Sequence, residues 1–170
     1  WSPDGAFLIF ANDHGGDERP DLWILKNGAA EPERLTESKV SEQEIQVSPD
    51  GKSIAYGVDR DRDFHFNVEV MDLATRKTRQ LTHESITLLK PCWSRDGKTI
   101  VAVRTADEGQ KGDLFVVDVA SSKTRVIPAP RKAGVLTPDG FLPDGRAVAR
   151  ATNDPGFPQI RRADLPAGKI

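Results

Sequence analysis

The chain has 170 residues, of which 37% are hydrophobic and 29% are charged, and its formal net charge is −2. This length is enough to bury a core, and the share of core-forming residues is lean but well above that of a disordered chain. Acidic and basic residues are interspersed and form no basic face, which argues against a nucleic acid as a partner.

The first element in chain order is a turn, Trp1-Ser2-Pro3-Asp4-Gly5, and it recurs through the whole sequence. Copies stand at 47–51 and 93–97, each 46 residues after the one before, and a fourth copy at 141–145 arrives two residues late. Two further blocks keep the same spacing. Apolar runs follow at 22–25, 68–73, 114–119 and 160–165, and short closing pairs lie at 35–36, 81–82 and 127–128. Three blocks in one register identify an internal repeat.

The turns predict tight connections between antiparallel strands. Proline presets its own φ, aspartate can hydrogen-bond its own backbone, and glycine accepts a positive φ. We therefore expect the recurring turn residues to be structural, and they are Asp4, Gly5, Asp50, Gly51, Asp96, Gly97, Asp144 and Gly145. The aromatic residues that open three copies, Trp1, Trp93 and Phe141, are expected to pack between neighbouring units.

Each unit is predicted to contain four β-strands, because branched apolar runs such as 54–58 and 100–103 follow the turns, while no sustained helical period is present. A four-stranded repeat of this length is typical of a β-propeller blade. We predict an all-β, partial propeller of about four blades in one domain, residues 1–170, truncated at both ends. The expected units are 1–37, 38–84, 85–130 and 131–170. An open arc with exposed edges is favoured over a closed four-bladed ring, because the first unit lacks its first strand and the last unit lacks its fourth.

The units resemble the WD40-like propeller repeats of the TolB family and of the N-terminal domain of the prolyl oligopeptidase family. The resemblance covers the whole chain and is carried residue by residue by 47–56, 68–73 and 81–82. The hairpin at 12–23 and the run at 70–82 are closer to dipeptidyl- and acylaminoacyl-peptidase propellers. TolB-type units more often carry a different, shorter hairpin.

The peptidase resemblance implies a non-catalytic propeller that gates peptide access to a C-terminal α/β-hydrolase domain of the same polypeptide. This chain lacks the Gly-x-Ser-x-Gly elbow of such a hydrolase, so no catalytic residue is expected within it. The parent protein is then expected to be a serine peptidase acting on peptides. The TolB resemblance implies instead a scaffold that binds protein partners.

Features unique to one unit are better candidates for function than features that recur. By this test the hairpins at 12–21 and 59–66 stand out, and Arg60, Arg62 and His65 are the candidate contacts to a peptide or to the hydrolase domain. The alternative is that 59–66 is a solvated hairpin of alternating charge.

The three histidines, His14, His65 and His83, are expected to be loop residues, since no nucleophile with a base and an orienting group can be assembled around them. Residues 12, 13, 17 and 18 could offer oxygen ligands to calcium, but their spacing differs from an EF-hand, and a charged hairpin is the simpler interpretation.

No cofactor or metal is expected. Cys92 is the single cysteine, which excludes a disulfide within the chain and a cysteine-based zinc site, and which is compatible with a cytoplasmic or a periplasmic location. No apolar run reaches the roughly 18 residues of a membrane-spanning helix, so no membrane segment is expected in this chain.

Overall fold

The structure, a computed structural model, describes residues 1–170 except 14, 17–18, 107–110, 130–134, 152–158 and 166–170. Every regular element in the described residues is a strand, and none of them forms a helix that could cross a membrane. The strands are β1 (Phe7–Asn12), β2 (Asp21–Lys26), β3 (Glu33–Arg34), β4 (Glu42–Val47), β5 (Ser53–Val58), β6 (Asn67–Asp72), β7 (Thr78–Gln80), β8 (Leu88–Trp93), β9 (Thr99–Ala106), β10 (Lys111–Asp118), β11 (Thr124–Ile127), β12 (Leu136–Phe141), β13 (Ala147–Ala151) and β14 (Gln159–Ala163).

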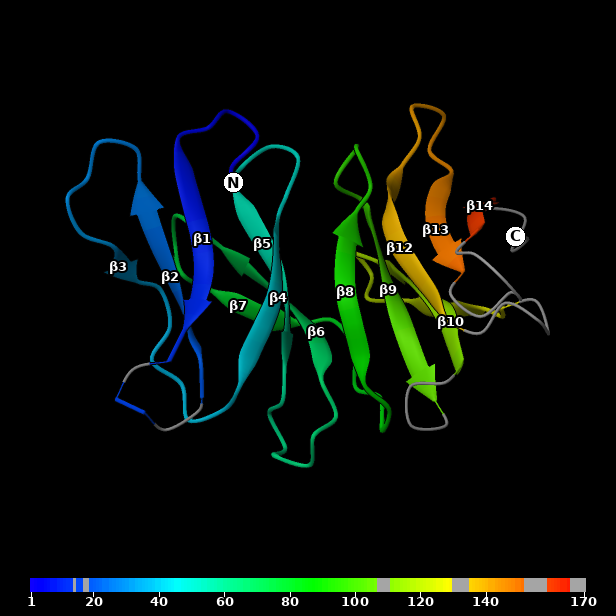
Figure 1. The fold of residues 1–170 in the computed structure, drawn as a ribbon, viewed down its shortest axis with the longest axis horizontal. Coiled ribbons are helices and arrows are strands. Elements are labelled where there is room, and N and C mark those ends of the chain that lie inside the picture. The colour runs from blue at the N-terminus through cyan, green and yellow to red at the C-terminus, as the bar shows by residue number, and fades with distance from the viewer. Residues whose placement is uncertain (14, 17–18, 107–110, 130–134, 152–158, 166–170) are drawn as a thin grey trace.

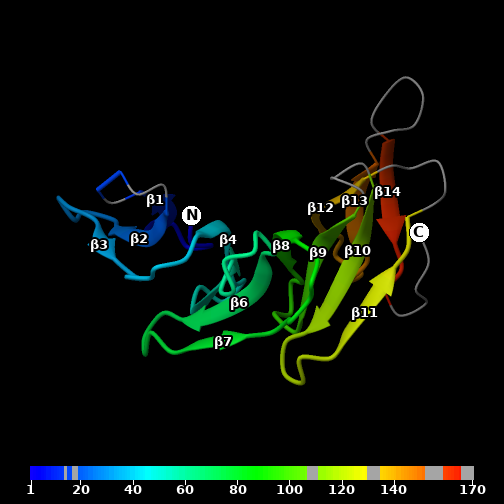
Figure 2. The same ribbon diagram turned by 90° about the horizontal axis from the view of Figure 1, so that it is seen from below.

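The strands form four antiparallel sheets, each built from consecutive strands (Figure 1). We call them blade 1 (β1–β3), blade 2 (β4–β7), blade 3 (β8–β11) and blade 4 (β12–β14). The blades follow one another around an open arc, with β4, β8 and β12 on its inner side and β7 and β11 on its outer side (Figure 2). The predicted all-β, partial propeller architecture is confirmed.

Strand register reproduces the sequence repeat. Phe7 pairs with Lys26, Ser53 with Asp72, and Thr99 with Asp118, so the equivalent hairpins of the first three blades have the same span of 19 residues between partners. In blade 4 the corresponding pair, Ala147 and Ala163, is only 16 residues apart. The last blade therefore keeps the topology of the repeat but has a shorter second hairpin.

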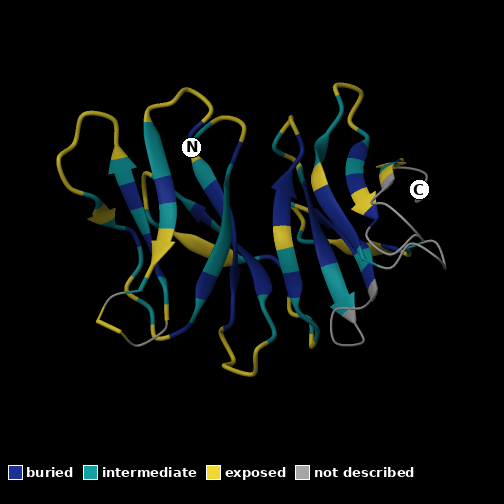
Figure 3. Cartoon of the chain, viewed as in Figure 1, coloured by how far each residue is buried: buried dark blue, intermediate teal, exposed yellow. Residues whose placement is uncertain are grey.

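The hydrophobic core lies between the blades, in three clusters that each join two neighbours. The cluster of blades 1 and 2 includes Leu22, Ile54 and Met71, and the next one includes Leu88 and Phe115. Buried positions run along the strands and exposed ones concentrate in the loops at the two ends (Figure 3). Strands covered on both faces by neighbouring blades explain why the sequence shows little polar alternation.

The three aromatic residues that open the turn copies do not behave alike. Trp93 is buried, and its indole Nε1 donates a hydrogen bond of 3.2 Å to the carbonyl oxygen of Gln46 in blade 2. Phe141 is partly buried. The prediction that Trp1 also packs between blades is wrong, because its side chain is 76% exposed. Trp93 packs because β4 of the preceding blade lies beside it.

The outer strands are linked between blades by polar side chains at equivalent positions. Glu33 of β3 accepts a hydrogen bond of 2.6 Å from Arg76, which follows β6 in blade 2. One repeat later, Arg79 of β7 donates to Ser122 at 2.7 Å in blade 3 and also to the carbonyl oxygen of Val119. These contacts hold neighbouring blades together at the outside of the arc.

Candidate functional site

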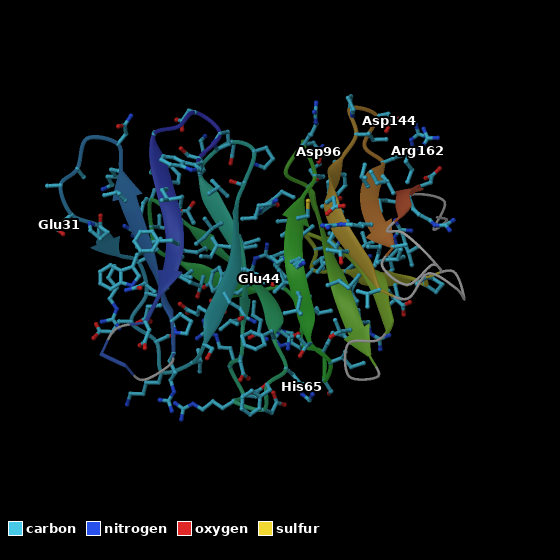
Figure 4. All side chains as sticks on the ribbon, in the orientation of Figure 1. Glu31, Glu44, His65, Asp96, Asp144 and Arg162 are labelled. Atoms are coloured by element: carbon cyan, nitrogen blue, oxygen red, sulfur yellow. The ribbon has the colours of Figure 1, made fainter. Side chains whose placement is uncertain are left out.

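The two ends of the blades have different chemistry. One end, the turn rim, carries the Asp-Gly turns 2–5, 48–51, 94–97 and 142–145. The opposite end, the hairpin rim, carries the described residues of the β1–β2 loop, the loop 59–66 and the connections from β3 to β4 and from β7 to β8. Figure 4 shows Asp96 and Asp144 at the turn rim and His65 at the hairpin rim.

The turn rim satisfies its own polar groups. In blade 3 the amide of Gly97 donates to the carbonyl oxygen of Ser94 at 3.0 Å, and the Asp96 carboxylate accepts from the Ser94 hydroxyl and the Lys98 amide at 2.7 and 3.1 Å. The hydrogen bond from Ser94 keeps the pKa of Asp96 below its usual value. The glycines that follow the aspartates have φ values between 69° and 82°, a region that glycine enters without strain. The residues of the turn rim therefore have a structural role, which is to reverse the chain direction between strands.

A groove of about 590 Å³ lies on the turn rim between blades 3 and 4. Phe141 and Leu165 contribute apolar walls, and Arg95 and Lys123 contribute cations. Its carboxylates, Asp96, Asp118 and Asp144, accept hydrogen bonds within their own turns. The lining residues include no histidine, and the Ser94 hydroxyl is held in its own turn by Asp96.

At the hairpin rim, the loop 59–66 is held from below by a buried aspartate. Asp59 is 7% exposed, and its carboxylate accepts hydrogen bonds from the amides of Asp63 and Phe64 at 3.1 and 3.2 Å. The Thr87 hydroxyl, from the connection to blade 3, donates to the carbonyl oxygen of Phe64 at 2.8 Å. The loop therefore has a defined path that is fixed by groups outside its tip.

Two residues of this loop adopt the left-handed conformation although neither is glycine. Arg62 has a φ of 58° and Phe64 a φ of 66°, and the Phe64 side chain is 82% exposed. Such values are strained for residues with a Cβ atom, most of all for a bulky one. The loop thus presents a large apolar ring and a guanidinium to solvent at a conformational cost.

A buried ionic network lies beneath the loop. Glu69 of β6 is 2% exposed, and its carboxylate accepts hydrogen bonds from the Arg60 guanidinium, with Nε to Oε2 at 3.0 Å and Nη2 to Oε2 at 2.7 Å. The Tyr56 hydroxyl donates to the same carboxylate. Pairing with Glu69 raises the pKa of Arg60, whereas burial and then Glu69 raise the pKa of Tyr56. Arg60 is therefore anchored from within the blade.

The network continues toward blade 1 through two more buried carboxylates. Glu42 is 1% exposed and accepts a hydrogen bond from the Thr36 hydroxyl, while Asp21 is paired with Arg34. Burial, helped by the negative charges of Asp21 and Glu69, raises the pKa of Glu42. Ionisation of Glu42 in the folded protein therefore costs free energy.

Blade 3 shows what the repeat looks like without this network. The residues 46 positions after Glu42, Tyr56 and Glu69 are Leu88, Ala102 and Phe115, and all three are buried. The same places in the fold are therefore polar in blade 2 and apolar in blade 3. Blade 3 shows that the repeat folds without charged side chains at these positions, so the ionic network is a specific feature of blade 2.

The three predicted contact residues come together on one loop, but in different settings. The Arg60 guanidinium is occupied by Glu69. The His65 Nδ1 lies 2.9 Å from a carboxylate oxygen of Asp63, and Arg62 projects from the exposed tip. Nothing in these contacts shows a peptide or a domain bound by them, and their role stays a prediction.

The remaining predicted candidates do not form a reactive group. His83 is exposed, and His14, Asp17 and Glu18 lie outside the described residues. Within the part of the chain that the structure describes, no hydrogen bond joins a serine or cysteine to a histidine, and no His, Cys, Asp or Glu cluster could hold a metal ion.

Sequence reasoning missed Asp59, Glu42 and Glu69. The sequence did contain a signal for two of them. Glu42 and Glu69 occupy strand positions whose equivalents in blade 3 are the apolar residues Leu88 and Phe115. A charge inside a strand buried on both faces requires a partner. The partners come from other strands, which a search for spaced motifs does not reveal.

No family model and no curated protein matches the chain. Solved structures do. A protein assigned as TolB from Agrobacterium tumefaciens has a TM-score of 0.75 and 23% identity, covering 99% of this chain and 61% of that chain. A puromycin hydrolase has a TM-score of 0.70 and 20% identity, covering 99% and 27%. A structure from a study of two prolyl endopeptidases has a TM-score of 0.65 and 16% identity, covering 93% and 28%.

These likenesses identify the fold. The neighbours are propellers of the TolB and prolyl peptidase types, as the sequence resemblance indicated. An oligogalacturonate lyase from Vibrio parahaemolyticus shares the fold too, with a TM-score of 0.69 and 16% identity over 92% of this chain and 45% of that chain. One architecture thus serves proteins with different activities. The chain spans less than two thirds of the length of each of these structures.

Proposed function

We propose that the chain is the non-catalytic propeller segment of a serine peptidase of the prolyl oligopeptidase family. In this proposal, residues 1–170 form one segment of the ring that controls which peptides reach an α/β-hydrolase domain of the same polypeptide. The observation that carries it is the loop 59–66 at the hairpin rim of blade 2. This loop exposes an arginine and a phenylalanine, whereas the Asp-Gly turns at the other rim bond their own polar groups.

The physical basis of gating is steric. A propeller is a rigid stack of radial sheets around a channel, so it admits an extended peptide and excludes a folded protein. Rigidity here is supported by the three inter-blade cores and by the outer contacts of Glu33 with Arg76 and of Arg79 with blade 3.

Within this proposal the loop 59–66 faces the hydrolase domain or the passing peptide. Arg62 and His65 are its proposed contact residues, since their side chains lie at the tip and edge of the loop. Arg60 has a supporting role, because its bidentate pairing with the buried Glu69 leaves it best placed to hold the loop on the blade.

A second candidate is a TolB-like propeller that acts as a scaffold for protein partners. It is favoured by one observation, the TM-score of 0.75 with a TolB-assigned structure of which this chain covers 61%. Under this alternative the same loop contacts a separate protein, and no hydrolase domain is needed.

The test uses the full-length protein that contains this chain. We expect a fluorophosphonate probe to label one serine beyond Ile170, within a Gly-x-Ser-x-Gly elbow, and we expect short peptides to be hydrolysed while a folded protein of the same cleavage sequence is spared. A full-length protein without a labelled serine and without an elbow would remove the peptidase proposal and leave the scaffold.

A further inference from the structure

The connection from β3 to β4, which joins blade 1 to blade 2, is held by two buried carboxylates. The amide of Ser38 donates to Asp21, at the start of β2, at 2.9 Å. The amide of Leu22 donates to the Thr36 hydroxyl at 2.9 Å, and that hydroxyl donates to Glu42, at the start of β4. We call this arrangement the first joint. Its two acidic side chains are both buried and carry charges of the same sign when ionised.

The charges in and beside the first joint do not balance. Asp21 is paired with Arg34, and Glu69 of β6 is paired with Arg60. In the described part of the chain, no ion pair reaches the third buried carboxylate, Glu42. An ionised carboxylate in the interior needs a cation beside it, whereas a protonated one needs only hydrogen bonds. One proton on Glu42 would therefore balance the cluster.

Among the described residues, the elements packed around Glu42 form no further ion pair with it. The Tyr56 hydroxyl of β5 donates to the carboxylate of β6, and β1 has no charged residue. The exposed Glu37 lies 3.6 Å from the guanidinium of the arginine in β3. On the β8 side of β4, the Lys90 amide donates to Glu44, two residues along the strand. Burial, with the neighbouring negative charges, accordingly raises the pKa of Glu42.

The connection between blades 2 and 3 has a similar set of hydrogen bonds without the buried charges. The amide of Val68 donates to the Thr82 hydroxyl at 2.9 Å, and that hydroxyl donates to the amide oxygen of Asn67 at 2.8 Å. The amide of Glu84 donates to the same oxygen at 2.8 Å. In this second joint, Asn67 and Leu88 stand 46 residues after the two carboxylates of the first. The repeat therefore contains a neutral version of the joint, which is an internal reference for the charged one.

We propose that the first joint is a proton-linked hinge, which holds blade 1 against blade 2 while Glu42 is protonated and opens more readily once Glu42 is ionised. An ionised Glu42 faces two like charges, Asp21 and Glu69, in an interior where charges interact strongly, and opening admits water that screens them. The folded protein favours the protonated form, so its stabilising effect is complete below the unfolded value of 4.5 and is lost as the pH rises through the raised folded pKa. Such a hinge would operate in a peptidase and in a scaffold alike, so it is independent of the proposed function.

The test measures hydrogen exchange in the full-length protein from about pH 5 to about pH 8. Division by the intrinsic rate at each pH gives a protection factor for each amide, which removes the general acceleration of exchange by hydroxide. The two joints are compared through amides that stand 46 residues apart and that donate to equivalent acceptors. The pairs are Leu22 with Val68, Leu35 with Leu81, Ser38 with Glu84, and Glu42 with Leu88.

In the wild type, protection at the first joint should fall by about tenfold relative to the second joint across this range, which corresponds to about 1.4 kcal/mol. Glu42→Gln keeps the shape of the side chain and a hydrogen-bond acceptor but cannot ionise, so it should abolish the fall. The matched control is Glu84→Gln, which removes a carboxylate from the connection of the second joint and should leave the fall unchanged.

Two results would overturn the proposal. If both joints of the wild type respond alike to pH, no hinge at the first joint is linked to a proton. This comparison needs no variant, so it decides even if Glu42→Gln fails to fold. If the fall at the first joint persists in Glu42→Gln, a different group, such as Asp21 or Glu69, carries the proton, and the role given to Glu42 is wrong.

Discussion

The turn rim and the hairpin rim both contain backbone positions with positive φ, but different residue types occupy them. The turn rim uses glycine at each of its four Asp-Gly turns, and blade 1 uses Gly15 and Gly16 in its hairpin loop, whereas blade 2 uses Arg62 and Phe64. Glycine at such a position serves the fold alone, while a large side chain there accepts strain in exchange for what the side chain can contact. The difference concerns these loops only, because Arg76 and Ser122, in the β6–β7 and β10–β11 loops beside the turn rim, also have positive φ.

The largest effect is expected from the network beneath the hairpin rim. Glu69→Ala should lower the free energy of unfolding by about 3 kcal/mol, because it leaves the Tyr56 hydroxyl and the Arg60 guanidinium without their shared acceptor. Urea denaturation followed by circular dichroism measures it. The control is Glu31→Ala in the exposed loop between β2 and β3, which should denature close to the wild type. Equal losses of unfolding free energy for the two variants would show that the buried network contributes no more to stability than an exposed side chain.

On the turn rim, Gly97→Ala should destabilise the protein by about 1–2 kcal/mol. A Cβ atom at Gly97 meets nothing within 4 Å, so the cost comes from its φ of 69° and not from a clash. Thermal unfolding of the purified protein gives the shift in Tm. A variant as stable as the wild type would contradict the view that glycine is required at this rim for its conformation.

The two rims should also respond oppositely to pH. The pKa of Glu42 is raised by burial, so its ionisation costs stability once the pH rises above its unfolded value of 4.5. Glu42→Gln should therefore stabilise the protein at pH 7 and make no difference well below pH 4.

The pKa of Asp96 is lowered, so its contribution is present above 3.8 and is lost as the pH falls through the folded value. Asp96→Asn should destabilise the protein at pH 7 and not in acid. Urea midpoints measured across this range compare the two.

The smallest effect is expected where a strained residue is replaced by glycine. Arg62→Gly should leave the free energy of unfolding within about 1 kcal/mol of the wild type and not below it, because relief of strain offsets the greater freedom of glycine in the unfolded chain. Its sign is thus opposite to that of Gly97→Ala. A clear loss of stability, measured by the same thermal unfolding, would mean that the Arg62 side chain supports the loop.

Local residue patterns were sufficient to predict much of the fold. The repeats at 1–5, 47–51 and 93–97 predicted the turns, and the runs 54–58 and 68–73 predicted strands, because a turn and an antiparallel hairpin depend on neighbours in the sequence. The loop 59–66 was identified as unusual because its run of alternating charges is not repeated in the other units.

Tertiary structure decided what the repeat could not. Trp1 and Trp93 occupy the same place in the sequence repeat, but Trp93 packs against β4 of the preceding blade and is buried, whereas Trp1 is exposed. Glu42 and Glu69 acquire their partners from other strands.

By itself the sequence determined the strand order, the turn chemistry and the blade architecture of this protein, because these follow from interactions over a few residues. Only the tertiary structure decided which charges are buried, where the backbone carries strain and which side chain of the loop stands free. Those properties depend on packing between blades, which brings together residues that no local pattern connects.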